Sequence, residues 1–188
     1  HPLARGNRIS PKADGGSGDD NLRVSGTIVD SEFMAGSGND TFTMDSNSNM
    51  NAGTNVSMGS GNDIAYLWGA FDGYLRMGRG NDLVDILYKV PTGEIRGGLG
   101  ADTFHFHGRN YVGEMNIVDF EAARDTIEFY GIGSLDDFTT VTQVGDDVIL
   151  FIATEVTDDA SDTGFYLRLG DTDIADLLPA VFVDLYSI

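Results

Sequence analysis

Five aspartates recur along the first half of the chain, and each one closes a short glycine-rich segment. They are Asp20, Asp40, Asp63, Asp82 and Asp102, at steps of 20, 23, 19 and 20 residues. The segments read GGSGDD at 15–20, AGSGND at 35–40, MGSGND at 58–63, MGRGND at 77–82 and GGLGAD at 97–102. Glycines can adopt positive φ and direct backbone carbonyls beside the carboxylate, which makes an oxygen ligand set suited to calcium. The pattern predicts a series of calcium-binding turns.

Apolar residues alternate behind every one of these aspartates. The position two residues after the aspartate holds Leu22, Phe42, Ala65, Val84 and Phe104. The position four residues after it holds Val24, Met44, Leu67, Ile86 and Phe106. Shortly before the turns stand Phe33, Val56, Leu75 and Ile95. A period of two indicates a strand with one buried face, so each repeat is expected to hold two short strands, one leaving the glycine turn and one entering it. We expect Gly26, Gly53, Gly73 and Gly93 at the opposite bend.

One such repeat forms one coil of a solenoid, and the coil spacing suits calcium. Parallel strands lie about 4.8 Å apart, and calcium binds oxygen at about 2.3–2.6 Å. An ion between two stacked turns therefore contacts oxygens of both. Five turns enclose four gaps, which predicts about four ions. The expected ligands are the glycines and the aspartate of each turn: Gly16, Gly18 and Asp20; Gly36, Gly38 and Asp40; Gly59, Gly61 and Asp63; Gly78, Gly80 and Asp82; Gly98, Gly100 and Asp102.

These segments resemble the RTX, or haemolysin-type, calcium-binding repeat G-G-x-G-x-D-x-U-x. The first and last copies match it fully, whereas Ala35, Met58 and Met77 replace the leading glycine in the middle three. The family repeats every nine residues or so and binds calcium on both edges of its roll. The wider spacing here implies ions along one edge and plain turns on the other. The 19-residue calcium β-solenoids of giant bacterial ice-binding adhesins are closer in period.

The resemblance continues beyond the repeats. Residues 115–132 are similar to the segment that follows the roll in serralysin-type and other type I-secreted proteins, and 144–152 and 166–183 look like capping strands. The final VDLYSI resembles an uncleaved type I secretion signal. By resemblance alone, Asp119 and Asp125 are the donors of a fifth calcium site against the cap.

The expected architecture is all-β, a right-handed parallel β-roll or β-solenoid with calcium along one edge and a C-terminal β-rich cap. Residues 1–14 are interpreted as an arm or linker, and 15–106 as a calcium-binding roll of five turns. Residues 107–188 are interpreted as the cap, with the secretion-signal-like end.

Composition excludes some partners and favours others. The chain has 188 residues with 30 acids against 11 bases, a formal net charge of −19 and no cysteine. This charge argues against nucleic acid and anionic membranes and favours cations. No apolar run approaches the roughly 18 residues that span a bilayer, which argues against membrane insertion. The chain begins with His1 instead of Met, so we expect a fragment or a processed product.

Catalysis within this chain is not expected. The zinc signature H-E-x-x-H of the serralysin proteases is absent, and no Ser, Cys or Lys has the context of a nucleophile. His105 and His107 alternate with Phe104 and Phe106, so we interpret them as solvated residues on the outer face of a strand, with a metal role as the minor alternative.

Two outer-face groups are candidate ligand-binding surfaces. Arg76 and Arg96 stack one coil apart with Tyr74 and Arg79 nearby, and could bind an anionic polysaccharide, as the calcium-roll modules of secreted mannuronan epimerases bind alginate. The alternative is that the arginines only neutralise the negative charges of Glu94 and the acidic turns, without binding a ligand. Tyr66 and Trp68 point outward together, which suits sugar stacking.

An ice-binding role would need a flat outward array on the turns. The candidate pairs are Ser17 and Asp19, Ser37 and Asn39, Ser60 and Asn62, Arg79 and Asn81, and Leu99 and Ala101. Arg79 and Leu99 interrupt this array, which argues against ice.

The predicted function is a secreted, non-catalytic calcium-binding module of the extracellular space or cell surface. It would fold on calcium after export by the type I secretion machinery and serve secretion, adhesion or extracellular assembly, including self-association. The alternative is a polysaccharide-binding accessory module of a secreted epimerase, lyase or protease whose catalytic part is absent. The minor alternative is an ice-binding solenoid.

Overall fold

The computed structural model describes residues 3–5, 12–87, 92–107, 113–130, 139–155, 163–177 and 181–184. Within these residues the chain is nearly all β, with strands stacked as a parallel β-solenoid of about six coils. The one helix among them is α1 (Ile174–Leu177). The predicted fold class is therefore confirmed.

The strands that leave the glycine–aspartate turns form one parallel sheet, called here the outgoing sheet. Other strands extend this sheet at its two ends. In sheet order it consists of β1 (Leu3–Arg5), β3 (Asn21–Ser25), β6 (Thr41–Met44), β9 (Ile64–Leu67), β12 (Leu83–Leu87), β14 (Thr103–His107), β16 (Thr126–Tyr130) and β20 (Val181–Asp184), of which β3, β6, β9, β12 and β14 follow the five turns. Equivalent positions of successive coils lie opposite one another. Leu83, for example, pairs with Ile64 of the coil before and Thr103 of the coil after.

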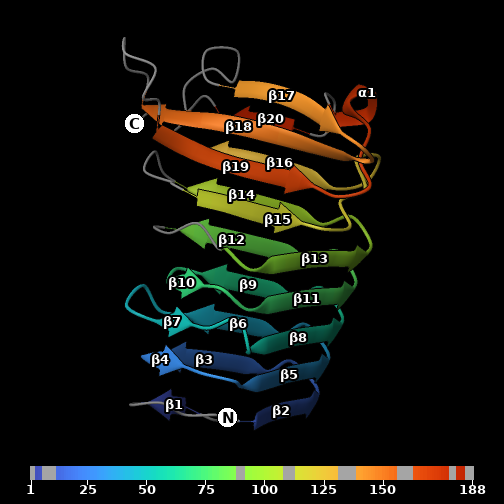
Figure 1. Cartoon of the computed structure of the whole chain (residues 1–188). Helices are drawn as coiled ribbons and strands as arrows, with labels where there is room; N and C mark the ends of the chain where they lie inside the picture. The colour runs from blue at the N-terminus through green and yellow to red at the C-terminus, as the bar shows by residue number, and fades with distance from the viewer. Residues whose placement is uncertain are drawn as a thin grey trace.

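The strands that enter the turns form the second sheet, the incoming sheet. Its parallel members are β2 (Lys12–Ser17), β5 (Glu32–Ser37), β8 (Asn55–Ser60), β11 (Tyr74–Arg79), β13 (Glu94–Leu99) and β15 (Gly113–Ile117). The cap continues this sheet with β19 (Thr163–Leu169), β18 (Asp147–Glu155) and β17 (Thr139–Val144). β19 is parallel to β15, whereas β18 is antiparallel to both of its neighbours, β19 and β17. Coils therefore stack from β1 and β2 at one end to the cap at the other (Figure 1).

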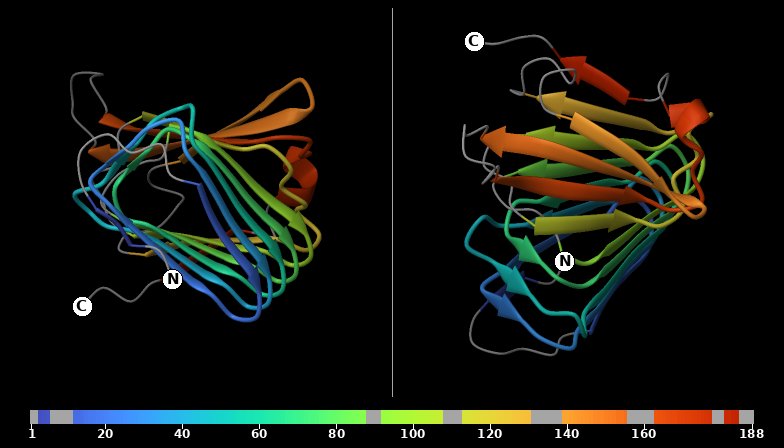
Figure 2. Two further views of the ribbon diagram at one scale, coloured as in Figure 1. Left: turned by 90° about the horizontal axis from the view of Figure 1, so that it is seen from below. Right: turned by 45° about the horizontal axis from the view of Figure 1, so that its top comes forward.

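A short third sheet makes the first three coils three-sided. It contains β4 (Thr27–Ile28), β7 (Asn49–Met50) and β10 (Ala70–Phe71). The expectation of two strands and one opposite bend per repeat is therefore incomplete. Gly26 lies at the bend before this third side, whereas Gly53 and Gly73 lie at the bend after it. A coil of 19 to 23 residues is longer than two short strands and two tight turns require. The additional residues form a third side of the coil around the apolar interior (Figure 2).

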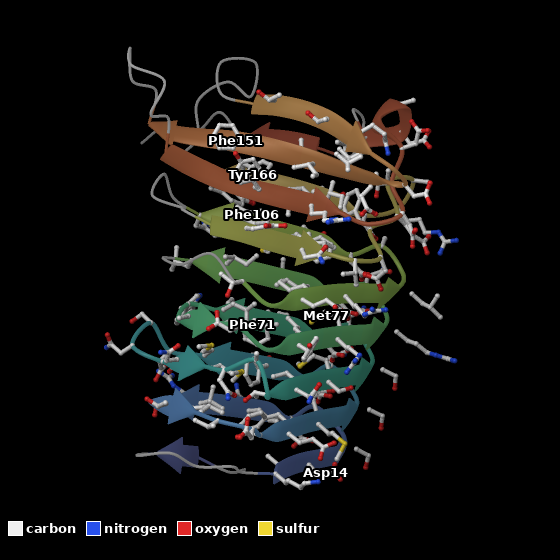
Figure 3. All side chains as sticks on the ribbon, viewed as in Figure 1. Asp14, Phe71, Met77, Phe106, Phe151 and Tyr166 are labelled. Carbon is white, nitrogen blue, oxygen red and sulfur yellow. The ribbon has the colours of Figure 1, made fainter. Side chains whose placement is uncertain are left out.

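The interior is filled by the alternating apolar positions predicted from the sequence. All fourteen of those side chains are buried, and Ile28, Met50 and Phe71 join them from the third sheet. Phe71, Met77 and Phe106 lie between the sheets (Figure 3). Phe106 stacks on Phe129 of the next coil with ring centroids 5.1 Å apart. Burying one such side chain contributes about 1.5–3 kcal/mol, so the stacked core is the main source of stability that needs no ligand.

The cap is fastened to the last coil by polar contacts. The hydroxyl of Thr172 donates to the carbonyl of Phe120 at 3.1 Å, and the backbone N–H of Gly170 donates to that of Ile117 at 2.8 Å. Within the cap, Arg168 Nε of β19 donates to the carboxylate of Asp147 of β18 at 2.8 Å. A non-repeating cap covers strand edges and apolar side chains that a final coil would otherwise expose. Among the described residues, α1 is the single helix, and its four residues are too few to span a bilayer.

Candidate metal-binding edge

Both glycines of every turn adopt a left-handed backbone conformation. φ lies between +90° and +147° at Gly16, Gly18, Gly36, Gly38, Gly59, Gly61, Gly78, Gly80, Gly98 and Gly100. A Cβ on Gly36 would lie 2.2 Å from the carbonyl oxygen of Gly16, and one on Gly38 would lie 2.4 Å from that of Gly18. The same contact recurs in each later coil, so carbonyls of one turn point along the solenoid axis at the glycines of the next. Glycine is required here by the dihedral angle and by the close stacking.

The aspartates of successive turns are joined by hydrogen bonds into what we call the aspartate column. The backbone N–H of each aspartate donates to Oδ1 of the aspartate one coil later, at 2.7–3.0 Å. The column consists of Asp20, Asp40, Asp63, Asp82, Asp102 and Asp125. One oxygen of each carboxylate from Asp40 onward therefore holds the preceding coil in register.

The other carboxylate oxygen has no such partner in five members of the column. Oδ2 of Asp20, Asp40, Asp63, Asp82 and Asp102 is buried and receives no hydrogen bond. Burying an anionic oxygen without a partner is costly. Five equivalent oxygens, each one coil from the next, indicate a shared kind of partner that repeats with the coil.

The residue five positions before the aspartate differs between the end coils and the middle ones. A Cβ on Gly15 would lie 2.7 Å from Oδ2 of Asp20, closer than real Cβ atoms approach. Gly97 shows the same contact with Asp102 at 2.5 Å. Ala35, Met58 and Met77 have a Cβ at this position and are buried. The three middle carboxylates must therefore lie farther from this backbone than those of the end turns.

The electrostatics of the column favour a cation. Burial is the main cause that raises the pKa of Asp82 to about 7; the backbone hydrogen bond from Asp63 opposes it, and the charges of Asp102 and Asp63 add smaller increases. Burial likewise raises the pKa of Asp102 to about 6, with the carboxylates of Asp125 and Asp119 adding to the effect. Burial also raises the pKa of Asp63. Burial is the largest cause of all three shifts and neighbouring carboxylates add to it, so a positive charge among these oxygens would offset the cost of keeping them ionised.

These residues fit calcium on the chemistry of their donors. The orphaned carboxylate oxygens and the axial glycine carbonyls are all hard oxygen ligands, and no nitrogen or sulfur ligand belongs to the column. Each gap between turns offers carboxylates from one or two coils.

The residues predicted for a fifth site take different places. Asp125 joins the column as its last member, but both of its oxygens accept backbone hydrogen bonds, Oδ1 from Asp102 and Oδ2 from Glu121 at 2.8 Å. Asp119 accepts from the N–H of Gly97 at 3.0 Å, and burial raises the pKa of its carboxyl. Both line a hollow between the 119–126 segment and the segment that includes Asp171 and Asp173. The fifth site stays a prediction, since Asp125 lacks the orphaned oxygen that marks the other five.

A second column runs along the outside of the same turns. Oδ1 of Asp19, Asn39, Asn62 and Asn81 each accepts the backbone N–H of the equivalent residue one coil later, at 2.7–3.0 Å. The exposed residues two positions earlier stand in register as Ser17, Ser37, Ser60, Arg79 and Leu99. Three serines followed by Arg79 and Leu99 make a short and interrupted array.

The predicted ligand-binding residues lie on two different sheets. Arg76 pairs with Arg96 in register on the incoming sheet, and Tyr74 is 40% exposed there. Arg96 donates from Nε to Glu94 at 2.9 Å, so part of its charge is already offset. Arg79 lies exposed at the end of the same strand.

Tyr66 and Trp68 belong to the other group. Their rings are 5.3 Å apart and tilted by 52°, and Tyr66 lies opposite Asp85 on the outgoing sheet. The two groups therefore do not form one site.

One partner of the two histidines, Asp85, was missed by the sequence reasoning. Asp85, His105 and His107 are half-buried and contact one another on the outer face of the outgoing sheet, so the histidines are not simply solvated. Burial would raise the pKa of Asp85, but hydrogen bonds and charge from His105 and His107 outweigh it and hold the pKa below its ordinary value. The available signal was spacing, because Asp85 precedes His105 by one coil of 20 residues.

Comparisons with known proteins yield a distant likeness. No protein-family model matches the chain, and no curated protein matches it. The extracellular lipase LipA from Serratia marcescens has a TM-score of 0.35 at 14% identity, over 88% of this chain and 38% of the lipase. A subunit of the mannuronan C5-epimerase from Azotobacter vinelandii has a TM-score of 0.32 at 20% identity, over 89% of this chain and 80% of the subunit. This chain thus spans 38% of the lipase's length. Scores this low add nothing to the argument from the turns.

Proposed function

We propose that this chain is a non-catalytic calcium-binding solenoid module whose folding depends on calcium. The observation that carries the proposal is the set of five buried, unpartnered Oδ2 atoms, repeated once per coil along one edge. Calcium between the turns would supply the positive charge that these oxygens lack. The carboxylates of Asp20, Asp40, Asp63, Asp82 and Asp102 would hold it, together with glycine carbonyls of the same turns.

The expected energies support a folding role. Calcium sites of extracellular modules have dissociation constants of about 10⁻⁴–10⁻³ M. At a calcium concentration about tenfold above such a constant, one site adds about 1.4 kcal/mol to the free energy of unfolding. Four sites would add about 6 kcal/mol, which is comparable to the whole net stability of a typical domain. Loss of calcium would therefore unfold the solenoid or leave it marginal.

This dependence suits work outside the cell, where calcium is plentiful. We propose that the chain stays largely unfolded in the low-calcium cytosol, passes a type I secretion channel in that state and folds after export. A net charge of −19 would hinder premature collapse without calcium and keep the folded module soluble. Adhesion or extracellular assembly is the role that such a long, regular surface serves best.

The test is a titration of the calcium-free full chain with calcium, followed by circular dichroism and calorimetry. We expect a cooperative gain of β structure and four to five ions per chain, with one ion for each gap. Magnesium at equal concentration is the matched control, because it is smaller and sheds its water reluctantly, so it should substitute poorly. Equal β content and equal melting temperature in chelator and in calcium would refute the proposal.

An anionic polysaccharide is the second candidate ligand. The exposed, in-register pair Arg76 and Arg96 favours it, and among the described residues Arg76 forms no ion pair. Binding of alginate that weakens about tenfold in Arg76→Ala, and not in Arg23→Ala on the other sheet, would support this reading. Equal binding by both variants would remove it.

A further inference from the structure

Two rows of side chains cross the outer face of the outgoing sheet near its cap end. In the first row, Tyr66, Asp85, His105 and Glu128 stand opposite one another on β9, β12, β14 and β16. In the second row, His107 stands opposite Tyr130. These positions are neither core nor fully solvated. The exposed fractions of the side chains are 16% for Asp85, 19% for His105 and 32% for His107.

Three of these side chains direct ligand atoms at one another. Oδ2 of Asp85 lies 3.0 Å from Nε2 of His107 and 3.7 Å from Nδ1 of His105. A tetrahedral zinc ion with bonds of about 2.0–2.1 Å holds its ligand atoms about 3.3 Å apart. The observed separations lie on either side of that value, so small side-chain rotations suffice to close the set around an ion. Among the described residues, this is the one such group of His, Cys, Asp or Glu with all ligand atoms within 4.8 Å.

The surrounding residues are arranged as they are around metal-bound histidines. If His105 offers Nδ1, its other ring nitrogen, Nε2, lies 3.1 Å from Oε2 of Glu128. That carboxylate accepts a hydrogen bond from the hydroxyl of Tyr130. The ring of His107 stacks on Tyr130 with centroids 4.5 Å apart and planes 5° from parallel. A carboxylate that receives the second N–H of a ligating histidine fixes its tautomer and orientation.

The donor types indicate which ion would bind. Two imidazoles and one carboxylate suit zinc, cobalt, nickel or copper, whereas calcium prefers oxygen ligands alone. Three protein ligands leave a fourth position for water or an external ligand, as in open zinc sites. The group lies on β12 and β14, away from the aspartate column at the turns, so the two kinds of ion would not compete.

We propose that Asp85, His105 and His107 form a second, calcium-independent metal site. It binds one divalent transition-metal ion, with zinc as the expected ion, and Glu128 acts as a positioning residue for His105. The alternative is a hydrogen-bonded cluster that never binds a metal.

The experiment uses the full chain without an affinity tag, held at saturating calcium so that the fold is constant. Zinc is titrated by calorimetry, and cobalt serves as an optical probe of tetrahedral nitrogen ligation. We expect one ion per chain with a micromolar or tighter dissociation constant that excess calcium does not change. His105→Gln, His107→Gln and Asp85→Asn should each weaken binding at least about hundredfold, and Glu128→Gln about tenfold.

The matched control is His1→Gln, since His1 is the one other histidine of the three in the chain. It should bind zinc as the parent does. Circular dichroism of each variant in calcium confirms that the fold is kept. Absence of zinc binding in the calcium-loaded parent would overturn the proposal. So would binding that survives His105→Gln and His107→Gln, or that is lost in His1→Gln.

Discussion

The backbone N–H of Asp63 donates a 2.8 Å hydrogen bond to Oδ1 of Asp82, while Oδ2 of Asp82 is buried and receives none. A single carboxylate thus has two separate tasks. One oxygen holds the preceding coil in register, and the other is left for a cation. Because the tasks belong to different atoms, substitutions can separate them.

Asp82→Asn should change stability in opposite directions with and without calcium. Asparagine keeps an oxygen that can accept from Asp63 but removes the buried charge. In chelator we expect the free energy of unfolding to stay within about 0.5 kcal/mol or to rise, because the repulsion with Asp63 and Asp102 is relieved. In calcium it should fall by at least about 1 kcal/mol as a ligand is lost. Urea unfolding measures the change in calcium, and folding induced by sucrose measures it in chelator, where the parent is unfolded or marginal.

Asp82→Ala is the control for that experiment, because it also removes the hydrogen bond to Asp63. It should destabilise by about 1–3 kcal/mol in both conditions. If Asp82→Asn and Asp82→Ala behaved alike in chelator, the hydrogen-bonding task of Oδ1 would be refuted.

An interior aspartate should matter more than a terminal one. Asp63 faces a gap on either side and accepts from the N–H of Asp40. Asp20 begins the column, and among the described residues no backbone N–H donates to its carboxylate. Asp63→Ala should therefore raise the calcium midpoint of folding more than Asp20→Ala, since it disturbs two sites and divides the stack. Fluorescence of Trp68, the single tryptophan, reports on the middle of the solenoid. Equal shifts would mean that the turns bind ions independently.

Gly36→Ala should be far more damaging than Gly16→Ala, although both residues occupy the same turn position with positive φ. At Gly16 a Cβ meets nothing within 4 Å, so the strain of the left-handed conformation, about 1–2 kcal/mol, is the whole effect. At Gly36 a Cβ would lie 2.2 Å from the carbonyl of Gly16, and the stack must open. We expect an additional loss of about 2 kcal/mol or more, measured by thermal unfolding in calcium. A difference under about 0.5 kcal/mol would contradict the close axial stacking.

Features that recur once in every coil could be predicted from the sequence, because they depend on the regular spacing of residue types. Phe42 and Met44 follow Asp40 at the same intervals as Phe104 and Phe106 follow Asp102, so burial and stacking could be inferred together. The aspartates could be placed in one column for the same reason. The spacing could not show which carboxylate oxygen of Asp82 accepts the hydrogen bond from Asp63, since that depends on the rotation of the side chain.

Two further features could not be predicted, for different reasons. The third sheet rests on strands of two residues, too short for any alternation to mark them. The contact between Asp85 and His107 crosses two strands diagonally, so it requires the coil register and the directions of both side chains.

The pH dependence of stability should reverse sign when calcium is added. Burial raises the pKa of Asp82 to about 7 and that of Asp102 to about 6, above the ordinary 3.8. Without calcium, the folded state therefore holds protons that the unfolded state has released. The stability that these two groups allow is therefore greatest below about pH 4, and it falls by at least about 1 kcal/mol as the pH rises from 4 through 7.

With saturating calcium the carboxylates must be ionised to bind, so protons compete with the ion and stability should rise from pH 5 to 8. Urea unfolding in calcium and sucrose-induced folding in calcium-free buffer, each at pH 5, 6, 7 and 8, give the two slopes. Asp82→Asn is the matched variant, because it lacks the carboxyl whose pKa burial raises to about 7. It should flatten the calcium-free slope while the hydrogen bond from Asp63 is kept. Slopes of the same sign in both buffers would mean that the ions bind away from the aspartate column, and the assignment of Oδ2 as their ligand would be wrong.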